Sequence, residues 1–304
     1  MTLPLVTYRG CVNTWECDQW GHQNVRFYIA KASDAQAALY AEIGLTPAYL
    51  RERGLMVRTV RDRVLFKREL HAGDAVSIRS GMREAQGAAI RHYSVLANEE
   101  TGTRSAVFET EAHLVDAGTG KAVELPAAVT SRAMRLAGTQ ASHPPPAPPE
   151  GPRAPVKDAP RSLLTHRGAF DSWERDESGW TPPRFQIGRL AQAATRLIEH
   201  LGLSKDVLLD RKLGNAALDY SIEYRAPLRP GQTIDVHSGV LEVGRKVLRI
   251  YHHLIDFAQG EVATQMEVAL VFFDLTARKS VPMPQEIVAA AHDLMRRPST
   301  RDAR

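Results

Sequence analysis

Residues 15–27 read Trp15-Glu16-Cys17-Asp18-Gln19-Trp20-Gly21-His22-Gln23-Asn24-Val25-Arg26-Phe27, and much of this run returns at residues 173–185. A shift of 158 positions, from 15 to 173, aligns the two runs without a gap and keeps one register as far as Asp116 and Asp274. One register held through so many glycine and tryptophan positions is not expected by chance. We infer that the chain is a tandem duplication.

Each copy predicts one long helix followed by several strands. In the first copy, apolar spacing predicts a helix from about residue 24 to residue 43, stopped by Gly44. In the second copy, a helix is expected to begin near Thr181, with Thr181 as N-cap and Pro182 at the first helical position. Strand-like runs separated by turn residues follow the first helix, which predicts an antiparallel meander wrapped around it; they span residues 57–70, 75–84, 88–98 and 105–116.

The repeat also predicts the domain organisation. We expect a first domain at residues 1–126, a linker at 127–160, a second domain at 161–295 and a tail at 296–304. The linker contains a proline-rich run at residues 143–150, which suits neither a helix interior nor a strand ladder, so a semi-extended connector is expected. The last residues are expected to form a frayed tail.

Composition excludes several classes of protein. The 304 residues are 43% hydrophobic and 24% charged, which favours packed domains over global disorder. The net charge of +4 comes from scattered basic residues without interleaved aromatic ones, so no nucleic acid partner is expected. Two cysteines, Cys11 and Cys17, cannot make a disulfide scaffold and are a poor zinc pattern, so no metal is predicted. Without a leader-like N-terminus or a long apolar run, no membrane association and a cytoplasmic location are expected.

The run Asp18-x-x-Gly21-His22-x-Asn24 before a long helix resembles the hotdog fold, in its acyl-CoA thioesterase branch that includes 4-hydroxybenzoyl-CoA thioesterase-like proteins. The resemblance covers both copies. It implies an α+β protein of two tandem hotdog domains, each a central helix wrapped by an antiparallel sheet, packed as an intrachain pseudo-dimer. It further implies a site at the domain interface and possible association of double hotdogs into dimers.

The same resemblance implies hydrolysis of an acyl-CoA or acyl-carrier-protein thioester, with coenzyme A entering only as part of the substrate and no cofactor. Asp18 would be general base or nucleophile, while His22 and Asn24 would hydrogen-bond the carbonyl or hold the attacking water. Free N–H groups at the helix start, around residues 24–26, suit an oxyanion. Alternatively, Asp18 only satisfies backbone donors in its turn, as the persistence of Asp176 in the second copy suggests.

The second copy lacks part of this polar set. Trp180 replaces His22 and Pro182 replaces Asn24, so one working site is expected, with Trp180 filling the second pocket. Candidate substrate-binding residues, including phosphate contacts on the strand after the helix, are Gly21, Arg26, Arg58, Arg61 and Arg63. For the three strand arginines, a solvated strand face is an equal alternative.

Other assignments stay open. Asp34, on the helix, is either an auxiliary carboxylate of the pocket or part of a solvated face. The hotdog fold also houses hydratases and dehydratases of acyl thioesters, although their Asp and His stand five positions apart and Asp18 and His22 stand four apart. A non-catalytic acyl-CoA-binding protein is the third possibility.

Overall fold

The computed structural model describes residues 5–137 and 162–296, and the chain forms two compact units. The first unit comprises residues 1–149 together with Asp176–Ser178, and the second comprises the other residues from 150 onward. Apart from Asp176–Ser178, each unit holds one copy of the sequence repeat, and each is described by itself below.

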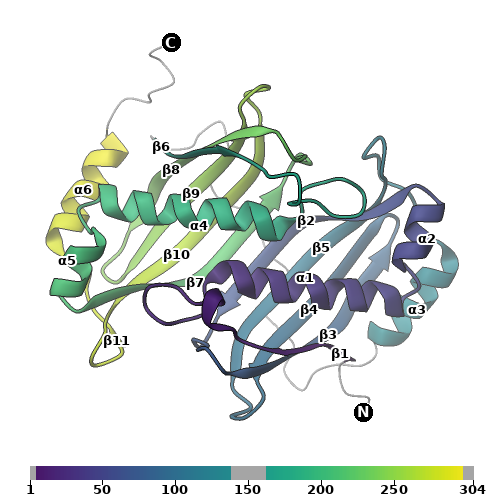
Figure 1. Ribbon diagram of the computed structural model, residues 1–304, viewed down its shortest axis with the longest axis horizontal. Helices are drawn as coiled ribbons and strands as arrows, with labels where there is room; N and C mark the ends of the chain where they lie inside the picture. Colours follow the sequence, from purple (N-terminus) through teal and green to yellow (C-terminus); the bar gives the residue numbers. More distant parts are fainter. Residues whose placement is uncertain (1–4, 138–161, 297–304) are drawn as a thin grey trace. The chain divides into compact units, whose positions relative to one another are not determined.

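The first unit contains one antiparallel sheet and three α-helices among its described residues (Figure 1). The strands hydrogen-bond in the order β1-β3-β4-β5-β2. The elements in chain order are β1 (Leu5–Cys11), the short 3₁₀ helix η1 (Thr14–Glu16), α1 (Val25–Glu42), α2 (Pro47–Glu52), β2 (Leu55–Phe66), β3 (Ala75–Gln86), β4 (Ala89–Asn98), β5 (Arg104–Asp116) and α3 (Ala127–Ala137).

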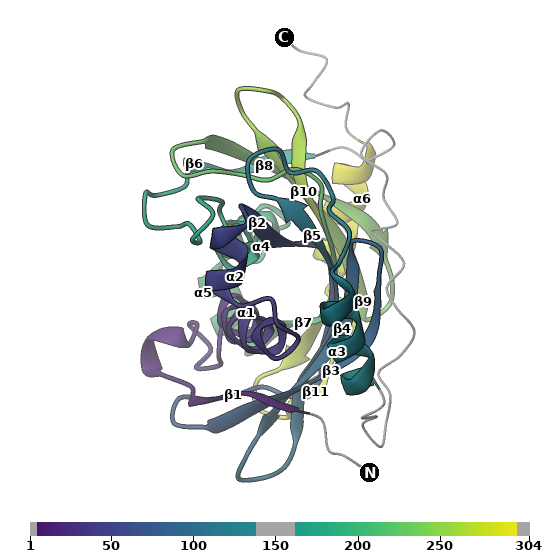
Figure 2. The same ribbon diagram turned by 90° about the vertical axis from the view of Figure 1, so that its right-hand side faces the viewer.

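Helix α1 forms the centre of this unit. It begins after the N-cap Asn24, and Gly44 follows its end with a φ of 94°, a conformation that glycine adopts without strain. Leu39 and Ile43 are fully buried and pack with residues of β3, β4 and β5. Figure 2 shows the sheet of this unit curving around α1. The later part of the apolar stripe predicted from the sequence therefore lies on the face that packs on the sheet, whereas its first members, Phe27 and Ala30, are only half-buried.

The second unit repeats this plan. Its strand order, β6-β8-β9-β10-β7, matches that of the first unit strand for strand, and a short extra strand pairs with β10. The elements are β6 (Leu163–Ala169), α4 (Pro183–His200), α5 (Lys205–Asp210), β7 (Leu213–Tyr224), β8 (Thr233–Val243), β9 (Val247–Asp256), β10 (Val262–Asp274), β11 (Lys279–Ser280) and α6 (Gln285–Arg296). Two units with one topology confirm the predicted tandem hotdog fold. Their packing as a pseudo-dimer stays a prediction.

The strand order corrects the simple meander expected from the sequence. β3, β4 and β5 are consecutive neighbours, but β2 pairs with β5, at the far edge from β3. Residues 67–74, between β2 and β3, are too many for a tight hairpin and carry the chain across the sheet. This crossing segment proves important for the candidate site.

The predicted linker begins too early. Residues 127–137 form helix α3, which packs on β3, with Val129 and Ala133 buried in the same core cluster as Leu39. The run holds no proline and places apolar residues four apart, so it can form a helix and bury one face. The rest of the linker and residues 297–304 of the predicted tail lie outside the described residues, and Arg296 is the last residue of α6.

The predicted start of the second helix is wrong by one position. Pro182 is the N-cap of α4 and Pro183 is its first residue, while the N–H of Thr181 is bonded to Leu228 O at 2.7 Å. The equivalent bond in the first unit joins Gln23 N to Leu70 O, also at 2.7 Å. In both units this bond ties the entrance of the central helix to the crossing segment.

Within residues 5–137 and 162–296, no helix combines the length and the apolar character that crossing a membrane requires.

Candidate functional site

The loop before α1 closes into a tight turn between Asp18 and His22. The N–H of Asp18 donates to His22 O at 2.8 Å, and the N–H of Gly21 donates to Asp18 O at 3.0 Å. Gly21 has a φ of 78°, which favours glycine here. Asp18 Oδ1 accepts from the N–H groups of Trp20, at 2.9 Å, and His22, at 3.4 Å. Asp18 thus forms an Asx turn through Oδ1, and any chemistry would fall to Oδ2.

The second unit keeps this structural part of the turn. Asp176 Oδ1 accepts from the N–H of Ser178 at 2.9 Å, and Gly179 has a φ of 85°. The prediction that Asp18 satisfies backbone donors in its turn is therefore confirmed for Oδ1, and Asp176 Oδ1 does the same in the second copy. The catalytic role of Asp18 stays a prediction.

Asn24 is the N-cap of helix α1, and most backbone N–H groups around it are already hydrogen-bonded. Its own N–H donates to Glu16 O at 2.8 Å, its Oδ1 accepts from Arg26 N at 3.0 Å, and its carbonyl accepts from Phe27 N at 2.9 Å. The sequence predicted free N–H groups throughout residues 24–26. Of these three residues, only Val25 has an N–H group without a hydrogen bond in the described structure. An oxyanion at this helix start would therefore meet the Val25 N–H.

A buried ion pair holds the loop onto the helix. Lys31 Nζ on α1 lies 2.8 and 2.7 Å from the two carboxylate oxygens of Glu16, and both side chains are buried. In the second unit, Glu174 and Arg189 make the corresponding pair at 2.7 Å. The polar turn is therefore attached to its helix in the same way in both copies.

Gln23 has the most unusual environment in the turn. Its side chain is 4% exposed, yet neither Nε2 nor Oε1 has a hydrogen-bond partner. An unpaired buried polar atom costs on the order of 1–3 kcal/mol, so an orphaned amide beside His22 and Asn24 is a candidate contact for a bound polar group. The sequence analysis assigned Gln23 no role. Its equivalent, Thr181, is also buried with Oγ1 unpaired.

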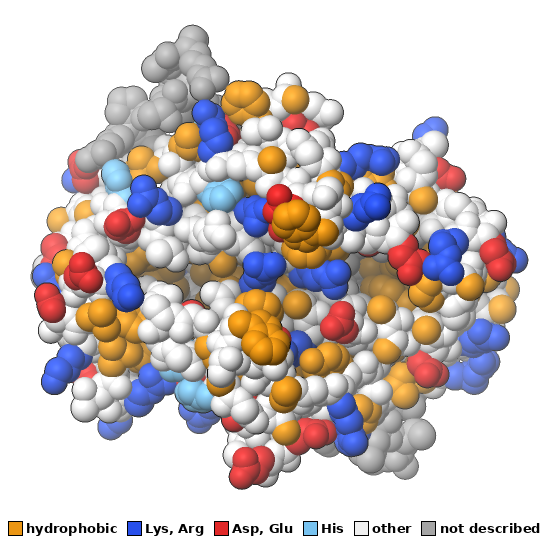
Figure 3. All heavy atoms as spheres, viewed as in Figure 1, with side chains coloured by type: hydrophobic (Ala, Val, Ile, Leu, Met, Phe, Trp, Pro, Cys, Tyr) orange, Lys and Arg blue, Asp and Glu red, His pale blue; other side chains and the backbone are white. Residues whose placement is uncertain are grey.

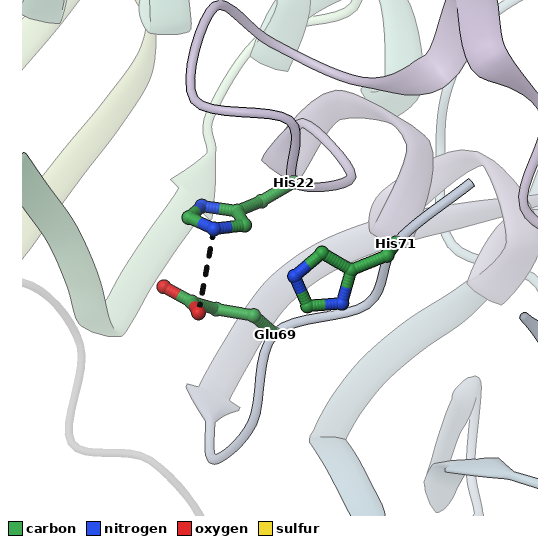
Figure 4. A group of neighbouring side chains, drawn as sticks. All are labelled: His22, Glu69 and His71. Atoms are coloured by element: carbon green, nitrogen blue, oxygen red, sulfur yellow. Dashed lines mark ion pairs between the residues drawn. The ribbon is translucent and has the colours of Figure 1, made fainter. Parts of the chain in front are cut away.

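The crossing segment brings two further polar residues to His22. His22 Nε2 lies 3.5 Å from Glu69 Oε2, and the rings of His22 and His71 meet edge to face with 5.2 Å between centroids. Figure 4 shows the three side chains pointing toward one another. Sequence reasoning missed Glu69 and His71 because they are distant from His22 along the chain. The available signal was their simultaneous replacement in the second copy, by Pro227 and Arg229.

Tyr28, one turn into α1, also borders the site. Its ring is buried and meets Phe66 edge to face. Burial raises the pKa of the Tyr28 hydroxyl well above its ordinary value, and the negative charges of Asp74 and Asp18 raise it further. Tyr28 therefore keeps its proton and can act only as a neutral hydrogen-bonding group.

The three strand arginines predicted to contact phosphate have different surroundings. Arg61 and Arg63 stand opposite Glu111 and Glu109 on β5. Burial raises the pKa of Glu109, opposed by Arg83 and to a smaller extent by Arg63; for Glu111, burial is outweighed by His113, Arg91 and Arg61, which together lower the pKa. The structure therefore favours cross-strand pairing for these two arginines. Arg58 differs, because its Nε is buried without a partner and burial lowers its pKa.

The other predicted residues take simple positions. The guanidinium of Arg26 lies 5.5 Å from the centre of the Phe27 ring, and Gly21 is exposed in the turn. Asp34 is exposed on α1, which agrees with the solvated-face reading. Trp180 is half-buried and stacks on the Arg229 guanidinium at 3.7 Å, so the second turn carries a Trp–Arg stack where the first has two histidines.

Charged side chains of both signs are interspersed over the face shown in Figure 3. Two large aromatic side chains, Trp15 and Trp173, are exposed at equivalent positions of the two copies. Each lies directly before the glutamate of the buried ion pair, Glu16 or Glu174. Their exposure is thus a shared feature of the duplicated loop.

Comparison with known proteins agrees with this architecture. A family model described as the thioesterase-like superfamily matches residues 12–133 and 173–291. No curated protein matches the chain in sequence. Among solved structures, a putative oleoyl thioesterase from Lactobacillus plantarum is similar with a TM-score of 0.70 and 12% identity, covering 91% of this chain and 97% of that one. The 12:0-ACP thioesterase from Umbellularia californica gives a TM-score of 0.68 at 12% identity, covering 88% and 93%. At these identities the structural likeness concerns the fold.

Proposed function

Because the chain belongs to the thioesterase-like superfamily, we propose that it hydrolyses an acyl thioester to a free acid and a thiol, at the polar turn before α1. The observation that carries the proposal is the contrast between the two turns. Both keep the aspartate and the glycine, but the imidazole and the side-chain amide before the helix occur only in the first, as His22 and Asn24. If the turn served only the fold, the aspartate and the glycine that both copies share would be sufficient.

In the proposed reaction, Asp18 acts through Oδ2 in one of two ways. As a general base it takes a proton from a water molecule that attacks the thioester carbonyl carbon. As a nucleophile it attacks that carbon itself, and water then cleaves the resulting anhydride. In both cases the C–S bond breaks and the thiolate leaves. The two bonds from Trp20 and His22 to Oδ1 fix the orientation of the carboxylate in either role.

The carbonyl oxygen becomes negatively charged as the reaction proceeds. The unpaired N–H of Val25, at the N-terminus of α1, is a donor placed for such a charge. The amide of Asn24 keeps its NH₂ group available while Oδ1 caps the helix, and His22 offers a ring nitrogen. One donor of this kind contributes roughly 3 kcal/mol to lowering a barrier.

The substrate proposed is an acyl-CoA or acyl-carrier-protein thioester, and the protein needs no further cofactor for this step. The named structural relatives include a putative oleoyl thioesterase and a 12:0-ACP thioesterase, which supports a fatty acyl group. Arg58 is the basic residue of β2 that remains as a candidate phosphate contact. Phosphate is present in both coenzyme A and the prosthetic arm of the carrier protein, so both thiols are tested.

The experiment measures thiol release from a panel of acyl-CoA and acyl-carrier-protein substrates. Asp18→Asn should lower kcat about 10²–10⁴-fold, because it removes the base while Asn Oδ1 still accepts both turn bonds. Asp176→Asn is the matched control, since it makes the same change in the equivalent turn and should leave kcat unaltered.

Three results contradict the proposal. The first is thiol release that persists in Asp18→Asn. The second is consumption of an enoyl thioester without thiol release, which indicates a hydratase. The third is tight acyl-thioester binding with no turnover, which indicates a carrier.

A further inference from the structure

Of the three clustered residues His22, Glu69 and His71, only His22 has a role in the hydrolysis described above; Glu69 and His71 have none. Two imidazoles and one carboxylate converge there, and one possible ligand atom from each residue lies within 4.8 Å of the others. His22 is half-buried, Glu69 is half-buried and His71 is exposed, so the group opens to solvent on one side. This is the ligand chemistry that first-row divalent metal ions prefer.

The separations suit a small ion. Metal–ligand distances of about 2.0–2.2 Å around a tetrahedral ion place neighbouring ligand atoms about 3.3–3.5 Å apart. His22 Nε2 and Glu69 Oε2 already stand 3.5 Å apart. The rings of His22 and His71 stand edge to face with 5.2 Å between centroids, and one ligand atom of each residue lies within 4.8 Å of the others (Figure 4).

Backbone contacts hold His22 and His71, and Leu70 next to Glu69, independently of any ligand. An isolated antiparallel bridge joins His22 with His71, and Gln23 N–H donates to Leu70 O at 2.7 Å. His71 N–H donates to Asp74 Oδ2 at 2.8 Å, and the Asx turn accepts the N–H of His22. The fold therefore sets the backbone at the cluster, and a bound ion would have to orient only the side chains.

The duplication offers an internal comparison. The second unit has the same turn, the same bridge bond and the same crossing segment, yet all three side chains are different there: Trp180, Pro227 and Arg229. Trp180 and Arg229 stack on each other at the equivalent place. The second copy therefore has no histidine–glutamate cluster at the equivalent place, and it serves as an internal reference that lacks all three possible ligands.

We propose that His22, Glu69 and His71 bind a divalent transition-metal ion of the zinc class, with water completing the coordination. His22 binds through Nε2, the atom that faces Glu69, which leaves the proton of the ring on Nδ1. The ion links the turn before α1 to the crossing segment and so stabilises the entrance of the helix. Calcium and magnesium are excluded as the preferred ions by the two imidazole ligands.

The test measures Zn²⁺ binding by calorimetry and Co²⁺ binding by visible absorption, on the full chain without a purification tag. Both cysteines are replaced by serine in the parent, because Cys11 and Cys17 are thiols near the site that could bind either ion. The parent should bind one equivalent. His71→Ala and Glu69→Gln should each weaken the affinity at least about tenfold. His71 is exposed, so its removal is compatible with folding.

His113→Ala is the matched control. His113 also pairs with a glutamate, Glu111, at 3.2 Å on the sheet, but this pair lacks a second histidine. It should bind as the parent does. Absence of stoichiometric binding in the parent, or equal affinity in the parent, His71→Ala and Glu69→Gln, overturns the proposal. No thioester is used, so this result is independent of the outcome for hydrolysis.

Discussion

At the scale of single residues, the buried side chain of Gln23 is better explained by ligand binding than by a role in folding. Its amide is buried and unpaired in the protein, and it lies between His22 and Asn24. Native proteins leave few such groups unsatisfied, because each costs stability. Retaining one beside the candidate catalytic groups is expected where binding a polar ligand outweighs the loss of stability.

We therefore expect Gln23→Met to stabilise the protein and impair its activity. Methionine has nearly the same shape and removes both unpaired atoms, so the free energy of unfolding should rise by about 1–3 kcal/mol. Chemical denaturation measures the gain, and thiol release measures the loss. Thr181→Val removes the unpaired hydroxyl at the equivalent position and should stabilise without lowering kcat. A less stable Gln23→Met would show instead that the amide is paired within the folded chain.

The sequence revealed some of these residues and not others, for a physical reason. An Asx turn and a helix cap are local, so Asp18 and Asn24 could be identified from their neighbours in the chain. Gln23, Glu69 and His71 acquire their meaning only through tertiary contacts. Likewise, Arg61 and Arg63 looked free for phosphate until the register placed Glu111 and Glu109 opposite them.

At the scale of elements, the loop before each central helix depends on a buried ion pair. Glu16 accepts two bonds from Lys31 and one from Asn13 N–H, and Glu174 accepts one from Arg189 and one from Asp171 N–H. A buried charge that loses its partner is strongly destabilising, whereas removing both charges costs much less.

Lys31→Met should therefore lower the free energy of unfolding by about 3–5 kcal/mol, because it strands the Glu16 carboxylate. Adding Glu16→Gln should recover a large part of this loss, since glutamine can still accept from Asn13 N–H. Denaturation of the two single variants and the double variant measures the coupling. Additive losses would mean that the pair contributes nothing specific. Arg189→Met with Glu174→Gln repeats the cycle in the second copy.

The elements that the sequence predicted well are those with a strong periodic pattern. The predicted helix at residues 24–43 is α1, and the four predicted strands are present with ends shifted by a few residues. Helix α3 was not predicted, because the proline-rich run at residues 143–150 indicated a linker over the whole of residues 127–160. The crossing from β2 to β3 could not be foreseen, because a local pattern identifies strands but does not say which strands pair.

At the scale of the whole molecule, each unit buries histidine in its sheet: His92 on β4 of the first, and His252 with its neighbour His253 on β9 of the second. His92 Nε2 lies 3.0 Å from the Tyr40 hydroxyl in the first unit, and His252 Nδ1 lies 2.6 Å from Ser238 Oγ in the second. Burial lowers the pKa of each imidazole to about 3, and the neighbouring His253 contributes to the shift at His252. Both side chains are therefore neutral in the folded protein at ordinary pH.

These histidines predict that acid destabilises the protein before its carboxylates titrate. The unfolded chain binds a proton at each imidazole near pH 6.5, whereas the folded chain does so only near pH 3. Between these values the unfolded state holds more protons, so stability is full above pH 6.5 and falls as the pH decreases. The expected slope is about 1.4 kcal/mol per pH unit for each histidine.

The duplication supplies the variants that test this slope. The first copy has Ser94 where the second has His252, and the second copy has Ile198 and Ile250 where the first has Tyr40 and His92. His252→Ser therefore rebuilds the hydroxyl chain that Ser80 and Ser94 form at 2.7 Å, without a titrating group. Between pH 7 and pH 5 the loss of stability, measured by denaturation, should be smaller by about 2 kcal/mol in this variant, and smaller again when Tyr40→Ile and His92→Ile are added. Since each substitution already occurs at the equivalent position of the other copy, an unchanged slope would mean that the two imidazoles are not buried as neutral groups in the folded chain.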